Sequence, residues 1–242
     1  IVFMIAGSLP FVLYLKCAFG DPRPFLKDTQ TQTFFGILFS AIAVMTIYLI
    51  LSQGMSPLHA LRLTIFNVTS IMTGTGYTST DFGLWGPFAV HLFFFLMVIG
   101  GCAGSTTCGI KVFRFQVLYS VASVQMKKLL HPHGVFIAKY NGRPLPHGVA
   151  SSVLSFFFLF ALCFSILSLL LSMTGLDYLT AMSGAATSLA NVGPGLGHEI
   201  GPSTTFKDLP DPSKWVLCVG MLLGRLELFT ILVLLSPHFW RR

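Results

Sequence analysis

The feature that most constrains this chain is a series of long apolar runs with few or no charged residues. A helix needs about 20 such residues to cross the roughly 30 Å hydrocarbon core of a membrane. Four runs are long enough, residues 33–52, 84–110, 149–173 and 214–237, and residues 1–15 look like the tail of a fifth. Charged residues make up only 10% of the chain, whereas soluble domains contain about a quarter. The sequence therefore predicts an all-α integral membrane protein.

The basic residues fall mainly in three segments outside these runs, which hold eleven of the fifteen. By the positive-inside rule we expect these segments to be cytoplasmic. They contain Lys16, Arg23 and Lys27; then Lys111, Arg114, Lys127, Lys128, Lys139 and Arg143; and finally Arg241 and Arg242. The aromatic residues are mostly phenylalanine, 24 in all, which suits helices packed together or facing lipid. We expect membrane lipid around the chain and no nucleic acid, despite its net charge of +7.

Two shorter apolar segments lie between the long runs, and each ends in backbone that cannot be helical. The first begins at Ser56, followed by a proline, which is a typical helix start, and it must stop at Gly74. The second follows Asp177 and ends within residues 190–195, whose proline and glycine cannot continue a helix. Each short helix is therefore expected to stop at a glycine-bearing loop between two spans.

The spacing of these features indicates an internal repeat. Gly76 and Gly193 lie 117 residues apart, and the runs that precede them start 116 residues apart. Each unit is a span, a short re-entrant helix, a glycine loop and a second span, so the two units are expected to be parallel. The predicted division is 1–32, the end of a preceding transmembrane helix with a cytoplasmic linker; 33–130, a first unit; 131–148, a cytoplasmic linker; and 149–242, a second unit.

The glycine loops favour a pore. Non-helical backbone at membrane depth survives only where it is packed in protein or lines a watery path. A helix directs its partial negative, carbonyl end at such a loop, which favours a cation there. Glycine allows successive carbonyls to point the same way, and rings of carbonyl oxygens can replace the water shell of K⁺.

We therefore predict that K⁺ binds at the carbonyls of Thr75, Gly76, Val192 and Gly193. The predicted selectivity filter comprises Gly74, Thr75, Gly76, Tyr77, Asn191, Val192, Gly193 and Pro194. In the alternative interpretation the glycines only terminate helices, as glycine commonly does. The matched offsets of the two loops make that alternative the weaker one.

The same residues carry a resemblance to a known family. Gly74-Thr-Gly-Tyr-Thr78 and Asn191-Val-Gly-Pro-Gly195 resemble the third and fourth selectivity-filter segments of the Trk/Ktr/HKT superfamily of K⁺ transporters. Residues 100–111, 220–229 and 236–242 resemble the C-terminal half of such transporters, so the match covers essentially the whole chain. In that superfamily four span-loop-span repeats surround one pore on a pseudo-fourfold axis, and two are present here.

The resemblance implies several properties of the complete protein. It implies K⁺ uptake across a bacterial cytoplasmic (inner) membrane, with K⁺ as the transported ion and no organic cofactor in this chain. The implied partners are a missing N-terminal half with two further repeats, a second copy in a homodimer, and a cytoplasmic nucleotide-binding TrkA-like ring on the basic faces. Two repeats alone are not expected to close a pore.

The glycine-rich stretch 100–109 is expected to break the second span of the first unit. Small residues also let helices pack closely, and that alternative would suit one or two glycines. Four in ten residues favour a loop across the permeation path, which the resemblance identifies as an intramembrane gate. The predicted gate residues are Gly100, Gly101, Gly104, Ser105, Thr106, Thr107, Gly109 and Arg225. A phosphate-binding P-loop is excluded because Ile110 stands where its lysine should be.

Arg225 is the cation in the middle of the last apolar run. It lies eleven residues from the start of that run and twelve from Pro237, so roughly 16 Å of helix would separate it from either end. An ionisable side chain at that depth predicts a functional role, and carbonyls of the loop 100–109 are the expected partners. The resemblance places a basic residue beside the gate. A purely structural ion pair with an acid of the missing half is the alternative.

No Ser/His/Asp, Cys/His or paired-carboxylate arrangement occurs at a workable spacing, so we do not expect an enzyme. The predicted function is passive K⁺ conduction through a carbonyl-lined filter, regulated at the glycine-rich loop. The main rival is a non-conducting membrane subunit or anchor derived from such a transporter.

Overall fold

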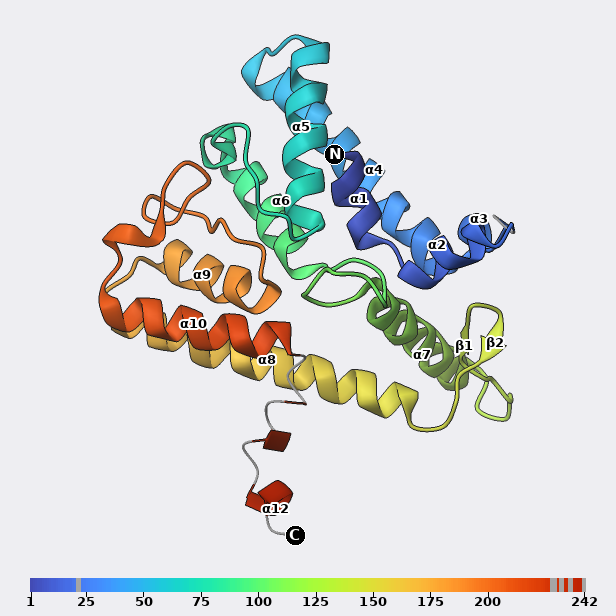
Figure 1. The fold of residues 1–242 in the computed structure, drawn as a ribbon. Coiled ribbons are helices and arrows are strands. Elements are labelled where there is room, and N and C mark those ends of the chain that lie inside the picture. The colour runs from blue at the N-terminus through green and yellow to red at the C-terminus, as the bar shows by residue number, and fades with distance from the viewer. Residues whose placement is uncertain (21–22, 227–229, 231–232, 235–236, 241–242) are drawn as a thin grey trace.

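The structure is a computed structural model that describes residues 1–20, 23–226, 230, 233–234 and 237–240. These residues are predominantly helical (Figure 1). The helices are α1 Val2–Ser8, α2 Phe11–Ala18, α3 Arg23–Lys27, α4 Thr29–Gln53, α5 Pro57–Met72, α6 Pro87–Val98, α7 Val112–Leu130, α8 Val149–Met173, α9 Tyr178–Ala190, α10 Asp211–Arg225 and α12 Pro237–Trp240. Two short 3₁₀ turns, Phe82–Trp85 and Phe206–Asp208, and the strands β1 Lys139–Tyr140 and β2 Arg143–Pro144 complete the described elements.

Two helices within the described residues, α4 and α8, are long and apolar enough to cross a membrane. Each has 25 residues, and each carries large apolar side chains on its exposed face, among them Phe39, Ile47, Phe158 and Leu169. Such a face suits contact with lipid. α6 is also apolar but has only 12 residues. The run 84–110 is thus interrupted before 100–109, as the glycines predicted, and the chain resumes as α7.

The same order of elements occurs twice along the chain. A long helix, a short helix, an irregular loop, a 3₁₀ turn and a further helix follow one another in α4 to α6 and again in α8 to α10. α5 packs against α4 and α6, and α9 packs against α8 and α10 (Figure 1). α6 also packs against α9, and this contact joins the two groups.

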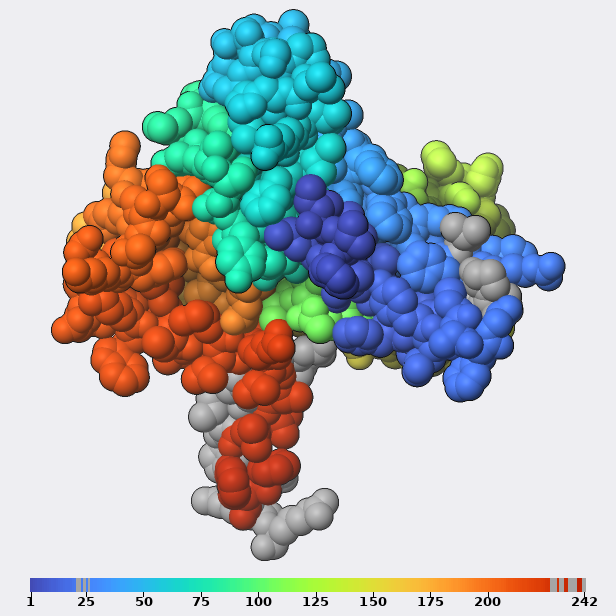
Figure 2. Space-filling model, turned by 45° about the horizontal axis from the view of Figure 1, so that its top comes forward, coloured from blue at the N-terminus to red at the C-terminus, as the bar shows by residue number. Residues whose placement is uncertain are grey.

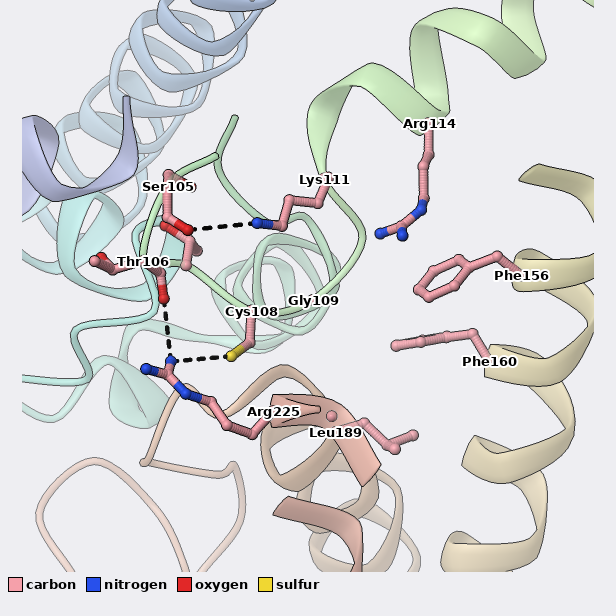
Figure 3. A pocket seen from close by; sticks show the side chains of 12 residues that line it. Ser105, Thr106, Cys108, Gly109, Lys111, Arg114, Phe156, Phe160, Leu189 and Arg225 are labelled. Atoms are coloured by element: carbon pink, nitrogen blue, oxygen red, sulfur yellow. Dashed lines mark hydrogen bonds between the residues drawn. The ribbon is translucent and has the colours of Figure 1, made fainter. Parts of the chain in front are cut away.

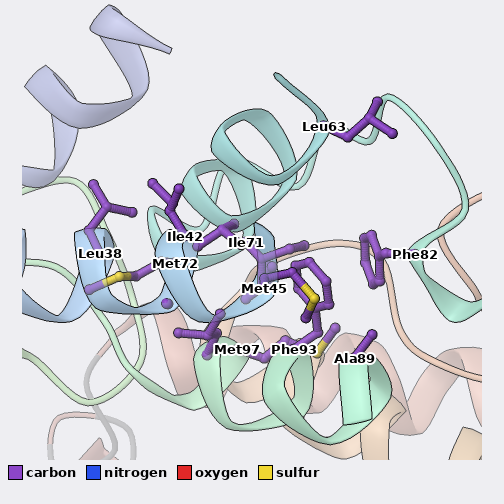
Figure 4. Packing of buried hydrophobic residues seen from close by; sticks show 14 of the residues in the cluster. Leu38, Ile42, Met45, Leu63, Ile71, Met72, Phe82, Ala89, Phe93 and Met97 are labelled. Atoms are coloured by element: carbon purple, nitrogen blue, oxygen red, sulfur yellow. The ribbon is translucent and has the colours of Figure 1, made fainter. Parts of the chain in front are cut away.

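The buried hydrophobic residues form two clusters, and the first, centred on α4 to α6, also takes in Ala190, Val192 and Leu196. In the first, methionines and aromatic rings from α4, α5 and α6 interdigitate, and the rings of Phe82 and Phe93 stack with centroids 4.1 Å apart (Figure 4). In the second, the small residues of α9 let α8 and α10 approach. A β carbon at Gly184 would lie 3.3 Å from Leu171 and 3.6 Å from Leu217, so the three helices pack closely at this position.

The described N-terminal residues differ from the prediction of one helical tail over 1–15. The chain forms two short helices, α1 and α2, with a break at Leu9 and Pro10. Proline lacks the amide hydrogen that a continuous helix needs, so α1 ends before it. In the space-filling view the dark blue α1 lies beside green atoms of the chain near residue 100, which also border orange and red segments (Figure 2). This break has consequences for the glycine-rich loop.

The last apolar run also differs from its prediction. α10 begins at Asp211 and ends at Arg225, so this arginine terminates a helix and does not lie in the middle of one. A side-chain amide of Asn191 binds the carbonyl of Met221 in the last turn of α10, at 3.1 Å. The contact comes from a distant part of the chain, so apolarity alone could not reveal it. Most of the remainder of the predicted span, including 227–229 and 231–232, lies outside the described residues.

Candidate functional site

The first glycine loop turns sharply at the end of α5. Gly74 has φ +65° and Gly76 has φ +78°, in the left-handed region that favours glycine. The backbone amides of Thr75 and Gly76 both donate to the carbonyl oxygen of Ser70, at 2.9 and 3.3 Å. Ser70 is fully buried on α5. The end of the short helix thus sets the direction of the first residues of the loop.

The second glycine loop is held in the same way at the end of α9. The amide of Val192 donates to the carbonyl of Thr187 at 3.1 Å, and the amide of Gly193 donates to the Thr187 hydroxyl at 3.0 Å. Ser70 and Thr187 lie 117 residues apart, which is the spacing of the two loops. Asn191 takes the left-handed conformation here, with φ +52°, and Gly193 has φ +118°. The matched offsets in sequence therefore correspond to matched hydrogen bonds.

A buried polar side chain on each short helix clamps the far end of its loop. Asn67 of α5 binds Ser79 twice, accepting from its amide at 3.0 Å and donating to its hydroxyl at 2.9 Å. Ser183 of α9 binds Leu196 twice, accepting from its amide at 2.9 Å and donating to its carbonyl at 3.0 Å. Sequence reasoning missed both clamps. Asn67 and Ser183 are each one of several buried polar residues on their helices, so the sequence did not single them out.

The two glycine loops meet each other directly. A β carbon at Gly76 would collide with the carbonyl oxygen of Val192 and would lie 3.2 Å from Pro194. A β carbon at Gly193 would lie 3.8 Å from the α carbon of Gly76. Beyond this contact, the hydroxyl of Thr78 donates to the carbonyl of Pro202 at 2.9 Å. The predicted filter residues of the two loops are therefore neighbours in space.

The glycine-rich stretch forms a closed loop between α6 and α7. Its neck is held by backbone hydrogen bonds, from Gly100 to Ile110 at 2.6 Å and from Ile110 to Val98 at 3.0 Å. A β carbon at Gly100 would collide with the carbonyl of Cys108, and Gly109 has φ +77°. The glycines are thus needed for close backbone approach at the neck and for a left-handed turn beside it. The rest of the loop projects away from this neck.

The break between α1 and α2 provides partners for the loop that the sequence did not reveal. Because α1 stops before Pro10, its last carbonyls lack helical partners. The carbonyl of Gly7 accepts from the amide of Thr106 at 3.1 Å and from its hydroxyl at 3.0 Å. The carbonyl of Ser8 accepts from the amide of Cys102 at 3.0 Å.

A side-chain hydrogen bond strengthens the same contact. The hydroxyl of Thr107 donates to the hydroxyl of Ser8 at 3.1 Å, and both residues are buried. The γ-methyl of Thr107 would lie 3.4 Å from a β carbon at Gly74. Thr107 therefore joins three segments: the loop it belongs to, the end of α1 and the first glycine loop.

A second chain of hydrogen bonds reaches the loop from the linker 131–148, which contains the β1–β2 hairpin. Gln30 of α4 accepts from the amide of Ala103 at 2.8 Å, and it also binds the hydroxyl of Tyr140 on β1. Burial raises the pKa of Tyr140 to about 12, and the nearby charge of Asp28 acts in the same direction. The hairpin is anchored on α7 through Ser120, which binds the backbone of Lys139 at 2.9 and 3.1 Å.

Arg225 contacts the loop, as the sequence predicted. Its Nη1 donates to the carbonyl oxygen of Thr106 at 3.2 Å and lies 3.4 Å from the Sγ of Cys108 (Figure 3). Because Arg225 is the last residue of α10, the guanidinium reaches the loop from a helix end. The contact with Cys108 was not predicted.

A cavity of about 530 Å³ lies between the two glycine loops and the glycine-rich loop. Residues of the predicted filter and residues of the predicted gate both line this cavity. From the predicted filter come Gly74, Thr75, Tyr77 and Asn191, and from the predicted gate come Thr106, Thr107 and Arg225. α1 closes another side with Phe3, Met4 and Gly7. The remaining predicted filter residues lie at the contact between the loops, and Gly100, Gly101 and Gly109 lie at the neck of the glycine-rich loop.

The arrangement offers oxygen ligands without a fixed negative charge at the loops. Carbonyl and hydroxyl oxygens suit a cation such as K⁺, whereas tetrahedral metal sites use thiolates and imidazoles. α5 and α9 both end at these loops, so the partial negative charge of each helix's carbonyl end lies beside them. The geometry is therefore compatible with the passage of a weakly bound cation.

The chain matches the family of TrkH cation transport proteins over residues 1–242. It is 48% identical over its whole length to the Trk system potassium uptake protein TrkI of Halomonas elongata, and covers 49% of that protein. It is 39% identical over its whole length to the Trk system potassium uptake protein TrkH of Vibrio parahaemolyticus, covering 50% of it. The chain thus spans about half the length of the curated relatives it matches.

A solved structure shows the same fold. The crystal structure of the potassium transporter TrkH from Vibrio parahaemolyticus superposes with a TM-score of 0.91 at 39% identity. The alignment covers 99% of this chain and 52% of that one.

Proposed function

The chain belongs to the TrkH family of cation transport proteins, and from this premise we propose that it forms part of a pathway for potassium uptake across a membrane. Its curated relatives are Trk system potassium uptake proteins. Because the chain spans about half of them, we propose that residues 33–130 and 149–242 are two pore repeats of four. The residues 1–32 and 131–148 then serve as the end of a preceding span with its linker and as the linker between repeats.

One observation carries this proposal: the two glycine loops touch each other. Gly76 faces the carbonyl of Val192, and each loop is hydrogen-bonded to its own short helix at equivalent positions. In our proposal the carbonyls of Thr75, Gly76, Val192 and Gly193 bind K⁺ in turn and replace part of its water shell. Two further loops from the missing half would complete the ring of oxygens.

We further propose that the glycine-rich loop is the gate. It lies across the cavity from the glycine loops, and Arg225 binds the carbonyl of Thr106 on one side of it. On another side it is held by the last residues of α1. A guanidinium has five donors in a fixed plane and is suited to hold several acceptors at once. In this proposal the closed state keeps these contacts, and their release lets the loop move aside.

The complete transporter is proposed to contain the N-terminal half, to form a homodimer and to bind a cytoplasmic nucleotide-binding ring of the TrkA type. We propose the cytoplasmic membrane of a bacterium as its location. The basic residues of α7 and the β1–β2 hairpin would face that ring. Lys127, Lys128 and Arg143 are exposed there. An acidic surface on the ring would be favoured by this charge.

The proposal is tested by growth of a K⁺-uptake-deficient bacterium at low K⁺. We expect co-expression of this chain with a matching N-terminal half to restore growth, and this chain alone to fail, because two glycine loops cannot surround an ion. The matched control is this chain with Gly36→Ala, co-expressed with the same N-terminal half. A β carbon at Gly36 has open space around it, and the residue has no unusual φ. Growth with the chain alone would contradict the four-repeat arrangement.

A further inference from the structure

The short helices α5 and α9 each carry a hydroxyl residue at the same position relative to their glycine loops. Ser70 precedes Gly76 by six residues, and Thr187 precedes Gly193 by six. Both residues are buried in this chain, and Ser70 is fully enclosed. The two hydroxyls nevertheless differ in their hydrogen bonds, and this difference indicates a role for Ser70 in ion selection.

In the second glycine loop the hydroxyl orients a carbonyl group. The amide of Gly193 donates to the Oγ1 of Thr187 at 3.0 Å. Because a peptide unit is planar and trans, this N–H and the carbonyl of Val192, which share one peptide, point in opposite directions. The Thr187 hydroxyl therefore sets the direction of the Val192 carbonyl, which is one of the proposed K⁺ ligands.

In the first glycine loop the corresponding amide binds the helix backbone instead. The amide of Gly76 donates to the carbonyl oxygen of Ser70 at 3.3 Å, which is longer than is usual for such a bond. The same oxygen accepts from the amide of Thr75 at 2.9 Å and from the hydroxyl of Thr73 at 3.3 Å. A carbonyl oxygen has two lone pairs, and here it is approached by three donors. The bond that fixes the Thr75–Gly76 peptide, and with it the Thr75 carbonyl, is therefore weak.

The hydroxyl of Ser70 has no hydrogen-bond partner among the residues that the structure describes. Because the side chain is enclosed by this chain, a group of the N-terminal half cannot reach it in the present arrangement. Burying a hydroxyl without a partner costs free energy, and alanine at the same position would avoid that cost. The unused acceptor thus lies on the residue whose carbonyl oxygen is approached by three donors.

We propose that Ser70 is a positioning residue for K⁺ selection, and that its hydroxyl accepts the Gly76 amide when K⁺ binds. Both acceptors belong to one residue, so the transfer requires a rotation of the Thr75–Gly76 peptide and no movement of α5. It leaves two donors on the Ser70 carbonyl and gives the hydroxyl a partner.

The transfer also makes the two glycine loops alike. The Thr75 carbonyl turns with its peptide and is then oriented by a helix hydroxyl, as the Val192 carbonyl is by Thr187. Two matched carbonyls would face the ion in place of one. This inference rests on the proposed function, because it takes the carbonyls of both loops as ligands of K⁺.

The experiment uses this chain assembled with its N-terminal half, and it compares wild type with Ser70→Ala. K⁺ and Na⁺ flux are measured in liposomes, and the unfolding midpoint is measured in detergent with KCl or NaCl at equal ionic strength. Thr69→Val is the matched control. Thr69 is also fully buried on α5, and its hydroxyl also has no partner in the described part of the chain. The amides of Thr75 and Gly76 bind Ser70, however, and not Thr69.

We expect Ser70→Ala to lower the ratio of K⁺ to Na⁺ flux about fivefold, as the loss of one hydrogen bond predicts. Its unfolding midpoint in NaCl should equal or exceed that of wild type, because the hydroxyl has no partner in the present arrangement. KCl should raise the midpoint of wild type above its value in NaCl, and the rise should be smaller in Ser70→Ala. Thr69→Val should keep the wild-type flux ratio and the wild-type response to KCl.

The second loop provides a contrasting pair of variants. Thr187→Val loses a hydrogen bond that is present in the structure, so it should lower both the flux ratio and the unfolding midpoint in NaCl. Thr187→Ser keeps the hydroxyl and should retain the wild-type flux ratio. Loss of selectivity without loss of stability is therefore expected for Ser70→Ala, and loss of both for Thr187→Val.

The inference is overturned if Ser70→Ala keeps the wild-type flux ratio, because the hydroxyl then takes no part in selection. A midpoint below wild type in NaCl would overturn it as well, since the hydroxyl would then already stabilise the arrangement without K⁺. An equal loss of selectivity in Thr69→Val would do the same by assigning the effect to α5 in general. In these three cases K⁺ flux through wild type leaves the transport proposal intact. Wild type that prefers K⁺ neither in flux nor in unfolding contradicts both.

Discussion

Gly76 faces the carbonyl oxygen of Val192 so closely that any side chain at Gly76 would collide with that oxygen. The two residues lie on different loops, at the ends of α5 and α9. Gly193, at the position in the second loop that matches Gly76, has open space by comparison, although its φ of +118° also favours glycine. The contact between the loops is therefore asymmetric, and the two glycines are needed for different reasons.

This asymmetry predicts unequal effects of alanine at the two positions. Gly76→Ala has to separate the loops as well as adopt a strained φ, so we expect loss of K⁺ over Na⁺ discrimination together with a lower unfolding temperature. Gly193→Ala keeps the loops together and bears only the cost of the left-handed conformation, roughly 1–2 kcal/mol. It should weaken discrimination with less loss of stability. The measurements are K⁺ and Na⁺ flux into liposomes and thermal unfolding of the assembled protein.

Gly36→Ala is the matched control for these substitutions, because it lies in α4 with nothing within 4 Å of its β carbon. It should leave both the flux ratio and the unfolding temperature unchanged. Unaltered ion preference in both Gly76→Ala and Gly193→Ala would remove these loops from the ion path.

Arg225 is predicted to restrain the glycine-rich loop. Arg225→Ala removes the hydrogen bond to the carbonyl of Thr106, and a shortened loop removes the barrier itself, so each should raise K⁺ or Rb⁺ flux into liposomes without a regulatory partner. Since both changes act on one element, the double variant should show less than the sum of the two effects. Lys128→Ala is the control for loss of a positive charge. A fall in flux for folded Arg225→Ala would make this residue a structural support or part of the conduction path.

The hydroxyl of Thr107 is predicted to hold the loop against α1. Thr107→Val keeps the shape of the side chain, including the methyl beside Gly74, but loses the hydrogen bond to Ser8. We expect a loss of about 1 kcal/mol in stability and a higher resting flux, because one anchor of the loop is gone. Thr107→Ser keeps the hydroxyl and is the matched control. Equal flux and unfolding temperature in the two variants would show that this hydrogen bond contributes nothing to the position of the loop.

Tyr140 is predicted to make stability depend on pH in the alkaline range. Its pKa is raised to about 12 by burial and then by the charge of Asp28, from an ordinary value of 10.0. The folded protein therefore keeps the phenol proton after the unfolded chain has lost it, and stability falls as pH rises from about 10 to about 12. Tyr140→Phe should lose this component of the pH dependence, as followed by thermal unfolding across that range.

The control for this prediction is Tyr119→Phe, since Tyr119 is exposed on α7. It should follow wild type at every pH. If Tyr140→Phe and wild type lose stability in parallel between pH 10 and 12, the phenol of Tyr140 is not responsible.

Sequence patterns were sufficient to predict those elements that are determined by residues close together in the chain. The apolar runs predicted α4 and α8, the proline after Ser56 predicted the start of α5, and the glycines of 100–109 predicted the break between α6 and α7. Arg225 was expected to contact the carbonyls of that loop, and its contact with Thr106 confirms this. Roles in ion selection and gating remain predictions, because they depend on an assembled pore.

Two helix ends differ from what the sequence predicted. α10 was expected to continue to residue 237, but it ends at Arg225, and most of the predicted remainder lies outside the residues that the structure describes. The segment 1–15 was expected to be one helical tail, although Pro10 lies within it. The break in this segment could have been predicted from Pro10. The hydrogen bond from Thr106 to the carbonyl of Gly7 beside the break could not.

The sequence by itself determined the family, the all-helical character and the positions where helices must stop, because hydrophobicity, proline and glycine act through neighbouring residues. The tertiary structure decided which of these helix ends face one another. It brought Gly76 against Val192 and Thr107 against Ser8. The physical reason is that backbone groups freed at a helix end must find partners. The residues that supply them are fixed by the packing of α5 against α4 and α6 and of α9 against α6 and α10, not by distance along the chain.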